Sequence, residues 1–207
     1  HECPGLSDKF GDVFVALYEK YEKEMPNLEK IKARDLMSKI IEAQIETGQP
    51  YMLYKDSINN KSNQKNIGVI KSSNLCAEIV EFSDKSETSV CNLASIALPK
   101  FVKKSKNKKS KEYDYEALYK TAKLATKNLD EVIDINFYPT DKTETSNSKH
   151  RPIGLGIQGL ADVFFELDIP YDSEEAKNIN KLIFETIYFG ALEASHELAI
   201  EKGTYST

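Results

Sequence analysis

Cysteine is scarce in this chain, which has three in 207 residues: Cys3, Cys76 and Cys91. So few cysteines cannot form the dense disulfide framework of a small secreted domain, and an odd number fits a reducing compartment. We therefore expect a cytoplasmic protein. The cysteines form no CxxC pair and the three histidines are scattered, so the spacing predicts no metal site.

Long apolar runs and excess positive charge are also missing. No apolar run approaches the ~20 residues that span a bilayer, and no signal peptide is visible. Acidic residues (33) outnumber basic ones (28), which argues against a general nucleic-acid or anionic-membrane binder. We expect neither partner. Forty per cent apolar residues, with 11 tyrosines and 9 phenylalanines, instead indicate an ordinary globular protein.

Apolar residues recur at helical spacing in several segments. Helices are expected over residues 10–21, 36–45, 118–133 and 160–167, and from 173 onward. Ser7 and Ser173 are the predicted N-caps of the first and last of these, and Gly48 is a predicted stop for the second. The last helix carries apolar residues on two faces, one of them with Phe184 and Tyr188, so we expect both faces to be buried.

Short strand-like segments are expected at residues 51–54, 68–70, 78–82, 95–98 and 151–158. Residues 56–66 are polar and predict a loop. The Lys-rich run at 103–111 has two interpretations, a phosphate or nucleic-acid patch and a solvated surface insertion. The second is favoured, because like-charge blocks are usually solvated surface. The mixed order of elements predicts a helix-rich α/β fold.

Gly154–Gly159 matches GxGxxG, the fingerprint of dinucleotide binding. The fingerprint needs a buried apolar strand before it and a helix that begins within it. A helix is expected to follow, but Lys149–Pro152 stands where the buried strand should be. We favour the competing interpretation, a glycine-spaced strand that a neighbouring backbone or side chain approaches closely.

Asn74, Cys76 and Glu78 place an amide, a thiol and a carboxylate at alternating positions. In an extended backbone such side chains point to one side, so all three could meet one small substrate. Burial of Asn74 and Glu78 beside Cys76 would be costly without partners, which favours a functional site. The structural alternative is an inert, buried Cys76. A second thiol, Cys91, follows fifteen residues later.

Longer motifs surround these residues. They lie at 51–56, 61–64, 73–79, 90–98, 150–154, 158–162 and 183–188. Together, and in this order, they closely resemble the large, catalytic subunit of class I ribonucleotide reductase of the eukaryotic type. The resemblance covers essentially the whole chain, with the Lys-rich run as an insertion or expansion.

The resemblance implies part of a ten-stranded α/β barrel with a finger loop through its centre. It implies that Cys76 is the finger-loop thiol, which becomes a thiyl radical and abstracts the 3′ hydrogen of a ribonucleoside diphosphate. Glu78 would take the 3′-hydroxyl proton, and Asn74 would hydrogen-bond the ribose hydroxyls. Cys91 would be one of two thiols that supply two electrons, with its partner outside this chain. Because a radical thiol needs shielding from water, we expect Cys76 to be buried.

Other parts of that family have no counterpart here, among them the regulatory ATP domain, the phosphate-binding loop and the C-terminal thiol tail. We therefore expect residues 1–207 to be a partial catalytic barrel domain, cut from a longer polypeptide, that binds no cofactor and is inactive alone. For the whole enzyme the resemblance implies ATP, dATP and other nucleoside triphosphates as effectors, and a radical supplied by a di-iron tyrosyl small subunit. The implied partners are that small subunit, ribonucleoside diphosphates, thioredoxin or glutaredoxin, and further large subunits in a homo-oligomer.

Two alternatives come from other functional classes. One is a dinucleotide-binding oxidoreductase that uses Gly154–Gly159, and a strand at these glycines would count against it. The other is a non-catalytic helical interaction module. Apolar packing around Cys76, with Asn74 and Glu78 facing elsewhere, would favour that module.

Overall fold

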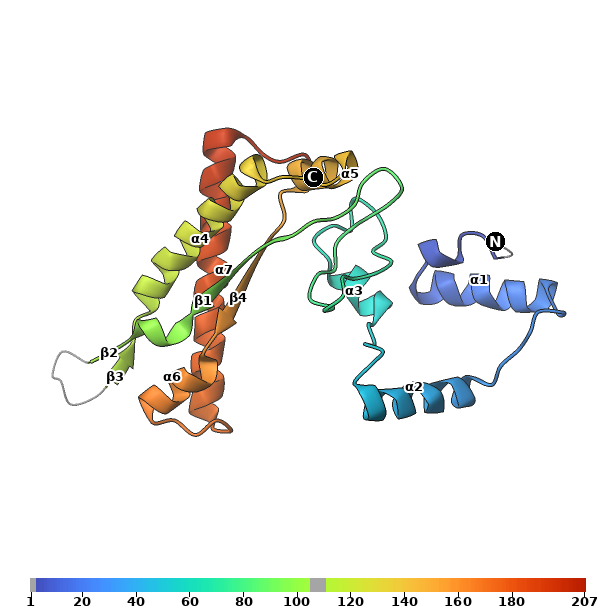
Figure 1. The fold of residues 1–207 in the computed structure, drawn as a ribbon, viewed down its shortest axis with the longest axis horizontal. Helices are drawn as coiled ribbons and strands as arrows, with labels where there is room; N and C mark the ends of the chain where they lie inside the picture. Colours follow the sequence, from blue (N-terminus) through green and yellow to red (C-terminus); the bar gives the residue numbers. More distant parts are fainter. Residues whose placement is uncertain (1–2, 105–110) are drawn as a thin grey trace. The chain divides into compact units, whose positions relative to one another are not determined.

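The computed structural model describes residues 3–104 and 111–207, which form two compact units (Figure 1). The first unit extends to Ser86 and also takes in Thr207, and the second comprises Glu87–Ser206. Helices dominate both, and the described strands lie in two small sheets. The α/β class is confirmed. In these described ranges no helix has the length and apolar character needed to cross a membrane.

Three helices make up the regular structure described in the first unit: α1 (Gly11–Glu24), α2 (Ala33–Thr47) and α3 (Lys55–Lys61), preceded by a 3-10 turn at Leu6–Asp8. The two longer helices confirm the predicted periodicity. Gly48 ends α2 in the left-handed conformation (φ 75°), as predicted. Ser7 is not a helix cap, because it lies within the 3-10 turn and α1 begins only after Phe10.

Several strand predictions in the first unit are wrong. Residues 51–54, 68–70 and 78–82 form no strand, because no neighbouring backbone pairs with them there. Conversely, α3 occupies part of the segment predicted to be loop. Its sequence is polar and has no apolar repeat that would predict a helix. The buried side chain of Asn59 stabilises α3 in the folded chain.

The second unit is built on a parallel pair of strands, β1 (Asn92–Ala97) and β4 (Ile153–Gln158). Asn92 is paired with Ile153, and the register continues without a break to Ala97 and Gln158. The crossover between them contains α4 (Tyr115–Ile135) and α5 (Asp141–His150). Both strands confirm the sequence prediction, although β1 begins three residues earlier than expected.

The remaining elements of the second unit are a 3-10 turn (Leu98–Phe101), β2 (Val102–Lys104), β3 (Lys111–Tyr113), α6 (Leu160–Leu167) and α7 (Glu174–Lys202). The antiparallel pair β2–β3 flanks the Lys-rich run, of which residues 105–110 lie outside the described residues. Ser173 caps α7 as predicted, since its side chain accepts a hydrogen bond from the Ala176 amide (3.1 Å).

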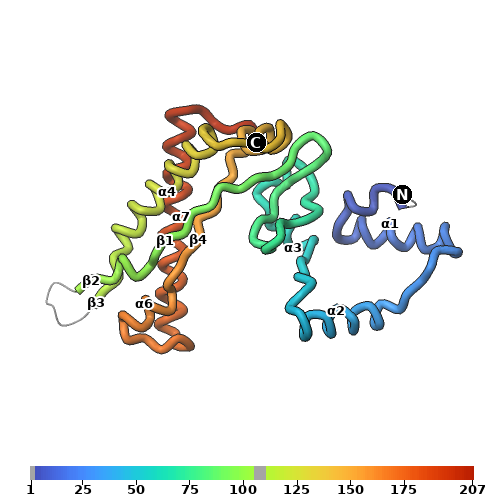
Figure 2. Tube along the Cα trace, viewed as in Figure 1, coloured from blue at the N-terminus to red at the C-terminus, as the bar shows by residue number. Residues whose placement is uncertain are grey.

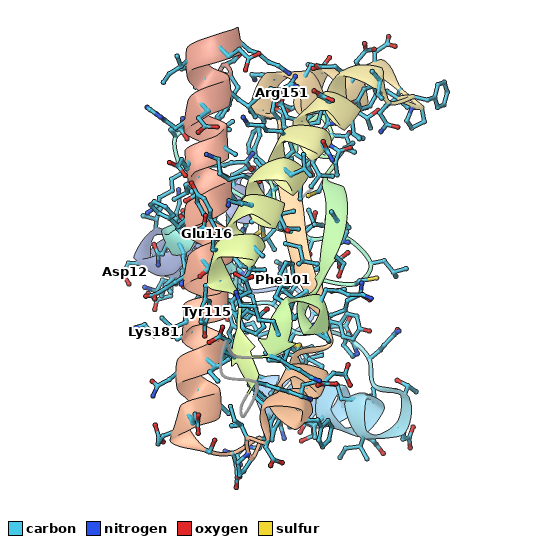
Figure 3. All side chains as sticks on the ribbon, turned by 90° about the vertical axis from the view of Figure 1, so that its left-hand side faces the viewer. Asp12, Phe101, Tyr115, Glu116, Arg151 and Lys181 are labelled. Atoms are coloured by element: carbon cyan, nitrogen blue, oxygen red, sulfur yellow. The ribbon has the colours of Figure 1, made fainter. Side chains whose placement is uncertain are left out.

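The core lies where α4 packs on the β1–β4 pair and on α7, and α6 adds side chains to it beside the 3-10 turn Leu98–Phe101. Its buried members are Ile96, Leu98, Leu118, Ala122, Val163, Ile183 and Ile187. Figure 3 shows the side chains of this unit, with Phe101 and Tyr115 at the end of α4 opposite to Arg151. The predicted two-sided burial of α7 is wrong: Phe184 and Tyr188 are 45% and 62% exposed, because only one face of the helix meets the core.

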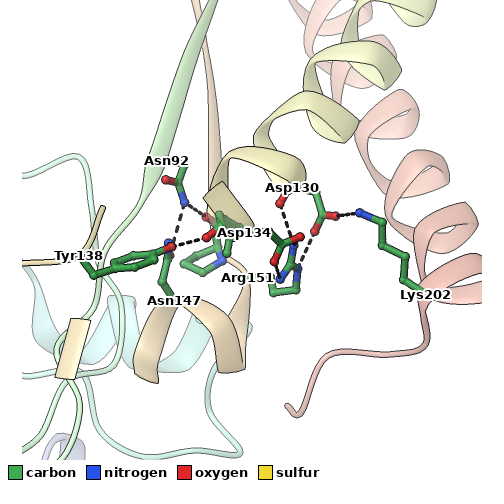
Figure 4. Close-up of polar contacts among 9 residues, drawn as sticks. Asn92, Asp130, Asp134, Tyr138, Asn147, Arg151 and Lys202 are labelled. Carbon is green, nitrogen blue, oxygen red and sulfur yellow. Dashed lines mark hydrogen bonds and ion pairs between the residues drawn. The ribbon is translucent and has the colours of Figure 1, made fainter. Parts of the chain in front are cut away.

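Helix α5 was not predicted from the sequence, because nearly all its residues are polar and give no apolar repeat. Its start is marked instead by a capping box, in which Thr140 and Thr143 satisfy each other's backbone amides. Asn147 is fully buried and donates to the Tyr138 hydroxyl, and the side chain of Asn92 at the start of β1 donates to the side-chain oxygen of Asn147 (3.4 Å; Figure 4). Buried polar groups thus join α5 to β1.

A charged cluster fixes the corner between α5 and β4 (Figure 4). Arg151 ends α5 in the left-handed conformation (φ 48°) and donates to the carboxylates of Asp130 (2.6 Å) and Asp134 (2.7 and 2.9 Å). Lys202 adds a bond to Asp130 (3.0 Å). Burial alone would raise the pKa of Asp130, but the hydrogen bonds from Arg151 and Lys202 outweigh it and lower that pKa below its ordinary 3.8.

Replacing Arg151 with methionine should loosen this corner, because two carboxylates one helical turn apart would then face each other without their shared cation. We expect a local loss of about 2 kcal/mol, or roughly 30-fold faster amide hydrogen exchange at Ile153–Gln158 in the intact subunit. Lys202→Met removes one bond and should have a smaller effect. Since the pKa of Asp130 is lowered, the ion pairs of Asp130 slow amide exchange in this region above about pH 4, and the slowing is lost as Asp130 is protonated at lower pH. Unchanged exchange in Arg151→Met would contradict the assignment.

Candidate active site

The candidate residues Asn74, Cys76 and Glu78 lie in a long connection between α3 and β1. Residues 62–91 are all described and form no helix or strand. After α3 the trace doubles back on itself, as Figure 2 shows. The result is a loop with two limbs and a tip, which the resemblance to a finger loop predicted.

Specific contacts hold the two limbs. The Phe82 amide donates to the side-chain oxygen of Gln64 (2.7 Å), which ties the limbs at their base. Gly68 lies against the Phe82 ring, where a Cβ would come within 2.3 Å of a ring carbon. The side chain of Asn59 exchanges two hydrogen bonds with the backbone of Ile70 (2.8 and 3.0 Å), which fixes one limb to α3. A loop without regular structure is therefore anchored at definite points.

The tip is a turn closed by the backbone and by one amide side chain. The Ala77 amide donates to the Asn74 carbonyl (3.2 Å), and Ala77 has a left-handed φ of 66°. The side-chain oxygen of Asn74 accepts from the Ile79 amide (3.1 Å), and its nitrogen donates to the Glu78 carboxylate (2.7 Å). Ser73 supports the turn by donating to the Ile79 carbonyl. Asn74 thus orients the carboxylate of Glu78.

This geometry corrects two expectations about Cys76. The backbone is not extended from Asn74 to Glu78, because the turn brings the amide and the carboxylate together directly. Cys76 is exposed, so the prediction that this chain itself would bury the thiol is wrong. The expectation that the side chains of Asn74 and Glu78 lie close together is confirmed. The sequence did not predict the left-handed Ala77 or the supporting roles of Ser73 and Gln64, because each depends on contacts made only after folding.

Cys91 lies in the second unit, half-buried, immediately before β1. The preceding residues are held by α5: the Thr88 amide donates to the Lys142 carbonyl (3.1 Å), and Glu87 lies 3.2 Å from His150 Nε2 and 3.2 Å from Lys149 Nζ. Both Glu87 and His150 are buried. The structure therefore places Cys91 at the edge of an ordered sheet.

The glycine fingerprint does not have the geometry of a dinucleotide site. Gly154 and Gly156 lie inside β4, whereas the fingerprint needs them in the turn after a strand. Gly159 does precede α6, with a left-handed φ of 79°, but a Cβ there would come within 2.7 Å of Pro99, so the space is already filled. Asp162 in the first turn of α6 would also repel a phosphate.

Comparison with known proteins identifies a family for the chain. A family model described as "Ribonucleotide reductase, barrel domain" matches residues 1–207. The chain is 53% identical over its full length to the ribonucleoside-diphosphate reductase large chain of Schizosaccharomyces pombe, of which it covers 25%. It is 56% identical over 205 residues (99% of the chain) to large chain 2 of Saccharomyces cerevisiae, of which it covers 24%, and 54% identical over its full length to the large subunit of Plasmodium falciparum, of which it covers 25%.

The chain thus spans about a quarter of the length of these curated relatives. Within that span the match is continuous, and it includes the loop tip and both strands of the parallel pair. From its sequence match and its α/β architecture, the chain belongs to the ribonucleotide reductase family, in the barrel domain.

Proposed function

We propose that residues 1–207 are a partial catalytic barrel domain of a ribonucleoside-diphosphate reductase large subunit. The observation that carries the proposal is the loop tip, where the exposed thiol of Cys76 stands in sequence between Asn74 and Glu78, whose side chains are hydrogen-bonded to each other. Three different chemical groups within five residues match a reaction that moves a hydrogen atom and a proton at one small site. The relatives are named ribonucleoside-diphosphate reductase large chains, and we propose that the reduction proceeds by such a step.

In the proposed mechanism Cys76 acts as a thiyl radical, after the small subunit has removed its hydrogen atom. The sulfur takes the 3′ hydrogen atom of the ribose, and Glu78 takes the proton of the 3′ hydroxyl. Asn74 holds the Glu78 carboxylate toward the reacting centre and donates to the ribose hydroxyls. Loss of the 2′ hydroxyl as water is followed by return of the hydrogen atom to the 3′ carbon, which regenerates the thiyl radical.

Cys91 supplies reducing equivalents in this proposal. The substrate needs two electrons and two protons, and two thiols give both when they join as a disulfide. The balanced result is a deoxyribonucleoside diphosphate, one water molecule and one disulfide from a ribonucleoside diphosphate and two thiols. We place the partner thiol of Cys91 outside this chain, and an external dithiol protein of the thioredoxin or glutaredoxin class restores both thiols.

The remaining partners belong to the whole subunit. We propose that it works with a di-iron tyrosyl small subunit, assembles with further copies of itself and responds to ATP, dATP and other nucleoside triphosphates at sites outside residues 1–207. This chain alone lacks the phosphate-binding loop, so it should be inactive. Deoxyribonucleotide synthesis for DNA replication in the cytoplasm is the proposed role.

The test is reduction of CDP by the intact subunit with its small subunit, ATP and an external dithiol protein. We expect dCDP from the wild type, loss of sustained turnover in Cys91→Ser, and near-normal turnover in Cys3→Ser. Cys3 is the matched control because it is a thiol outside both the loop tip and the β1–β4 pair, and its sulfur donates to the sulfur of Met25 (3.8 Å). No dCDP from the wild type, or full turnover from Cys91→Ser, would refute the proposal.

A further inference from the structure

The β1–β4 pair has one face toward the helices and one face away from them. Asn92 and Ile96 of β1 are buried, whereas Leu93 and Ser95 are exposed, as expected for alternating side chains. Cys91 precedes Leu93 by two positions and lies on the same outward face. The partners of Leu93 and Ser95 on β4 are Gly154 and Gly156. The outward face beside the Cys91 thiol is therefore lined by glycine.

Gly154 leaves space next to the sulfur of Cys91. A Cβ at this position would come within 3.4 Å of Cys91 Sγ and 2.5 Å of a Leu93 methyl carbon. Gly156 has the same strand setting but different neighbours: a Cβ there would lie 3.6 Å from the Ala94 carbonyl oxygen and 3.9 Å from Ser95 Oγ, which are ordinary contacts. Neither glycine has a positive φ, so the backbone conformation does not require glycine at position 154. The feature that distinguishes Gly154 is the space beside Leu93 and Cys91 Sγ that a Cβ would fill.

We infer that Gly154 is a positioning residue for Cys91, which keeps the approach to its sulfur open so that a second sulfur can bond to it. A disulfide has an S–S length of about 2.05 Å and a dihedral angle near 90°, so the second sulfur and its carbon must enter from a narrow range of directions. Crowding from a methyl group restricts that range. The inference rests on the redox role proposed for Cys91, and it explains one glycine of the GxGxxG pattern without a nucleotide.

The reaction served is the one already balanced above. The S–H bonds of Cys91 and its partner thiol break, one S–S bond forms, and two electrons and two protons pass to the substrate intermediate. In a separate thiol–disulfide exchange, the external dithiol restores both thiols and itself becomes a disulfide. Formation of the disulfide requires a sulfur to approach Cys91 Sγ, so a methyl group at position 154 should slow that step.

The experiment compares Gly154→Ala with Gly156→Ala in the intact subunit. The first readout is the rate of Cys91 labelling by iodoacetamide in the reduced enzyme, followed on the Cys91 peptide by mass spectrometry. The second is dCDP formation, resolved into kcat and KM. We expect Gly154→Ala to slow labelling by roughly tenfold and to lower kcat with KM unchanged, because the added methyl group blocks part of the approach to the sulfur. Gly156→Ala should match the wild type in both.

A third variant keeps the test decisive if Gly154→Ala folds poorly. Leu93→Ala combined with Gly154→Ala removes the closer of the two contacts and leaves the methyl group beside the sulfur, so labelling should still be slow. Wild-type labelling in either Gly154 variant, or equal slowing in Gly156→Ala, would overturn the inference. Slow labelling with undiminished kcat would instead overturn the redox role of Cys91, which separates failure of the inference from failure of the proposed function.

Discussion

Replacement of Cys76 by serine should reduce deoxynucleotide formation by the intact subunit to below detection. A thiyl radical forms and transfers hydrogen because the S–H bond is weak, whereas the O–H bond of serine is far stronger. The substitution is nearly isosteric, and Cys76 is exposed at the tip of the loop, so the turn should survive. The loss would therefore report chemistry rather than unfolding.

The measurement is dCDP formation over many hours with saturating small subunit and reductant. Substrate binding provides the control, since Cys76→Ser should bind CDP as the wild type does when measured by calorimetric titration. Hydrogen bonds at the tip involve Asn74, Ala77, Glu78 and Ile79, not the sulfur. Turnover of Cys76→Ser at a near-native rate would exclude a thiyl radical at this position.

Glu78→Gln should lower kcat by about 10²- to 10⁴-fold, the usual effect of losing a positioned acid–base group. Glutamine retains an oxygen that can accept the hydrogen bond from Asn74 Nδ2, which is 2.7 Å long in this structure, so the turn should stay closed. KM should therefore change little. What disappears is the capacity to take the 3′-hydroxyl proton.

A useful companion variant is Asn74→Ala, which removes the hydrogen-bond donor that orients Glu78 but retains the Glu78 carboxylate. It should cost less than Glu78→Gln in kcat, because it disorders the base without deleting it. Steady-state kinetics with CDP at several concentrations separates the two effects. An unchanged kcat in Glu78→Gln would remove Glu78 from the proposed mechanism.

Parts of this fold could be predicted because their apolar residues repeat with a clear period. The helices α1, α2, α4 and α7 and the strands β1 and β4 are all of this kind. Helix α5 could not be found in this way, since its buried residues are polar and Asn147 has its partners, Asn92 and Tyr138, outside the helix. Residues 51–54 have a strand-like composition but no strand pairs with them, so the strand predicted from composition alone is wrong.

In the candidate site, too, residue types could be predicted from the sequence, whereas features that depend on folding could not. The sequence indicated Asn74, Cys76, Glu78 and Cys91 by residue type and resemblance, and their roles stay predictions. It did not predict the turn, because Ala77 adopts a conformation that non-glycine residues seldom take. Nor did it predict that Gly154 would lie beside Cys91, since that depends on strand register.

The parallel pairing of β1 with β4 also sets an order of events during synthesis. The paired residues lie about 60 positions apart. At translation speeds of about 5–20 residues per second, roughly 3–12 seconds separate the emergence of Cys91 from that of the strand that will hold it. During that interval Cys91 is a nascent-chain thiol only fifteen residues from Cys76, so a reducing compartment would help to prevent a Cys76–Cys91 disulfide, which the proposed mechanism does not use.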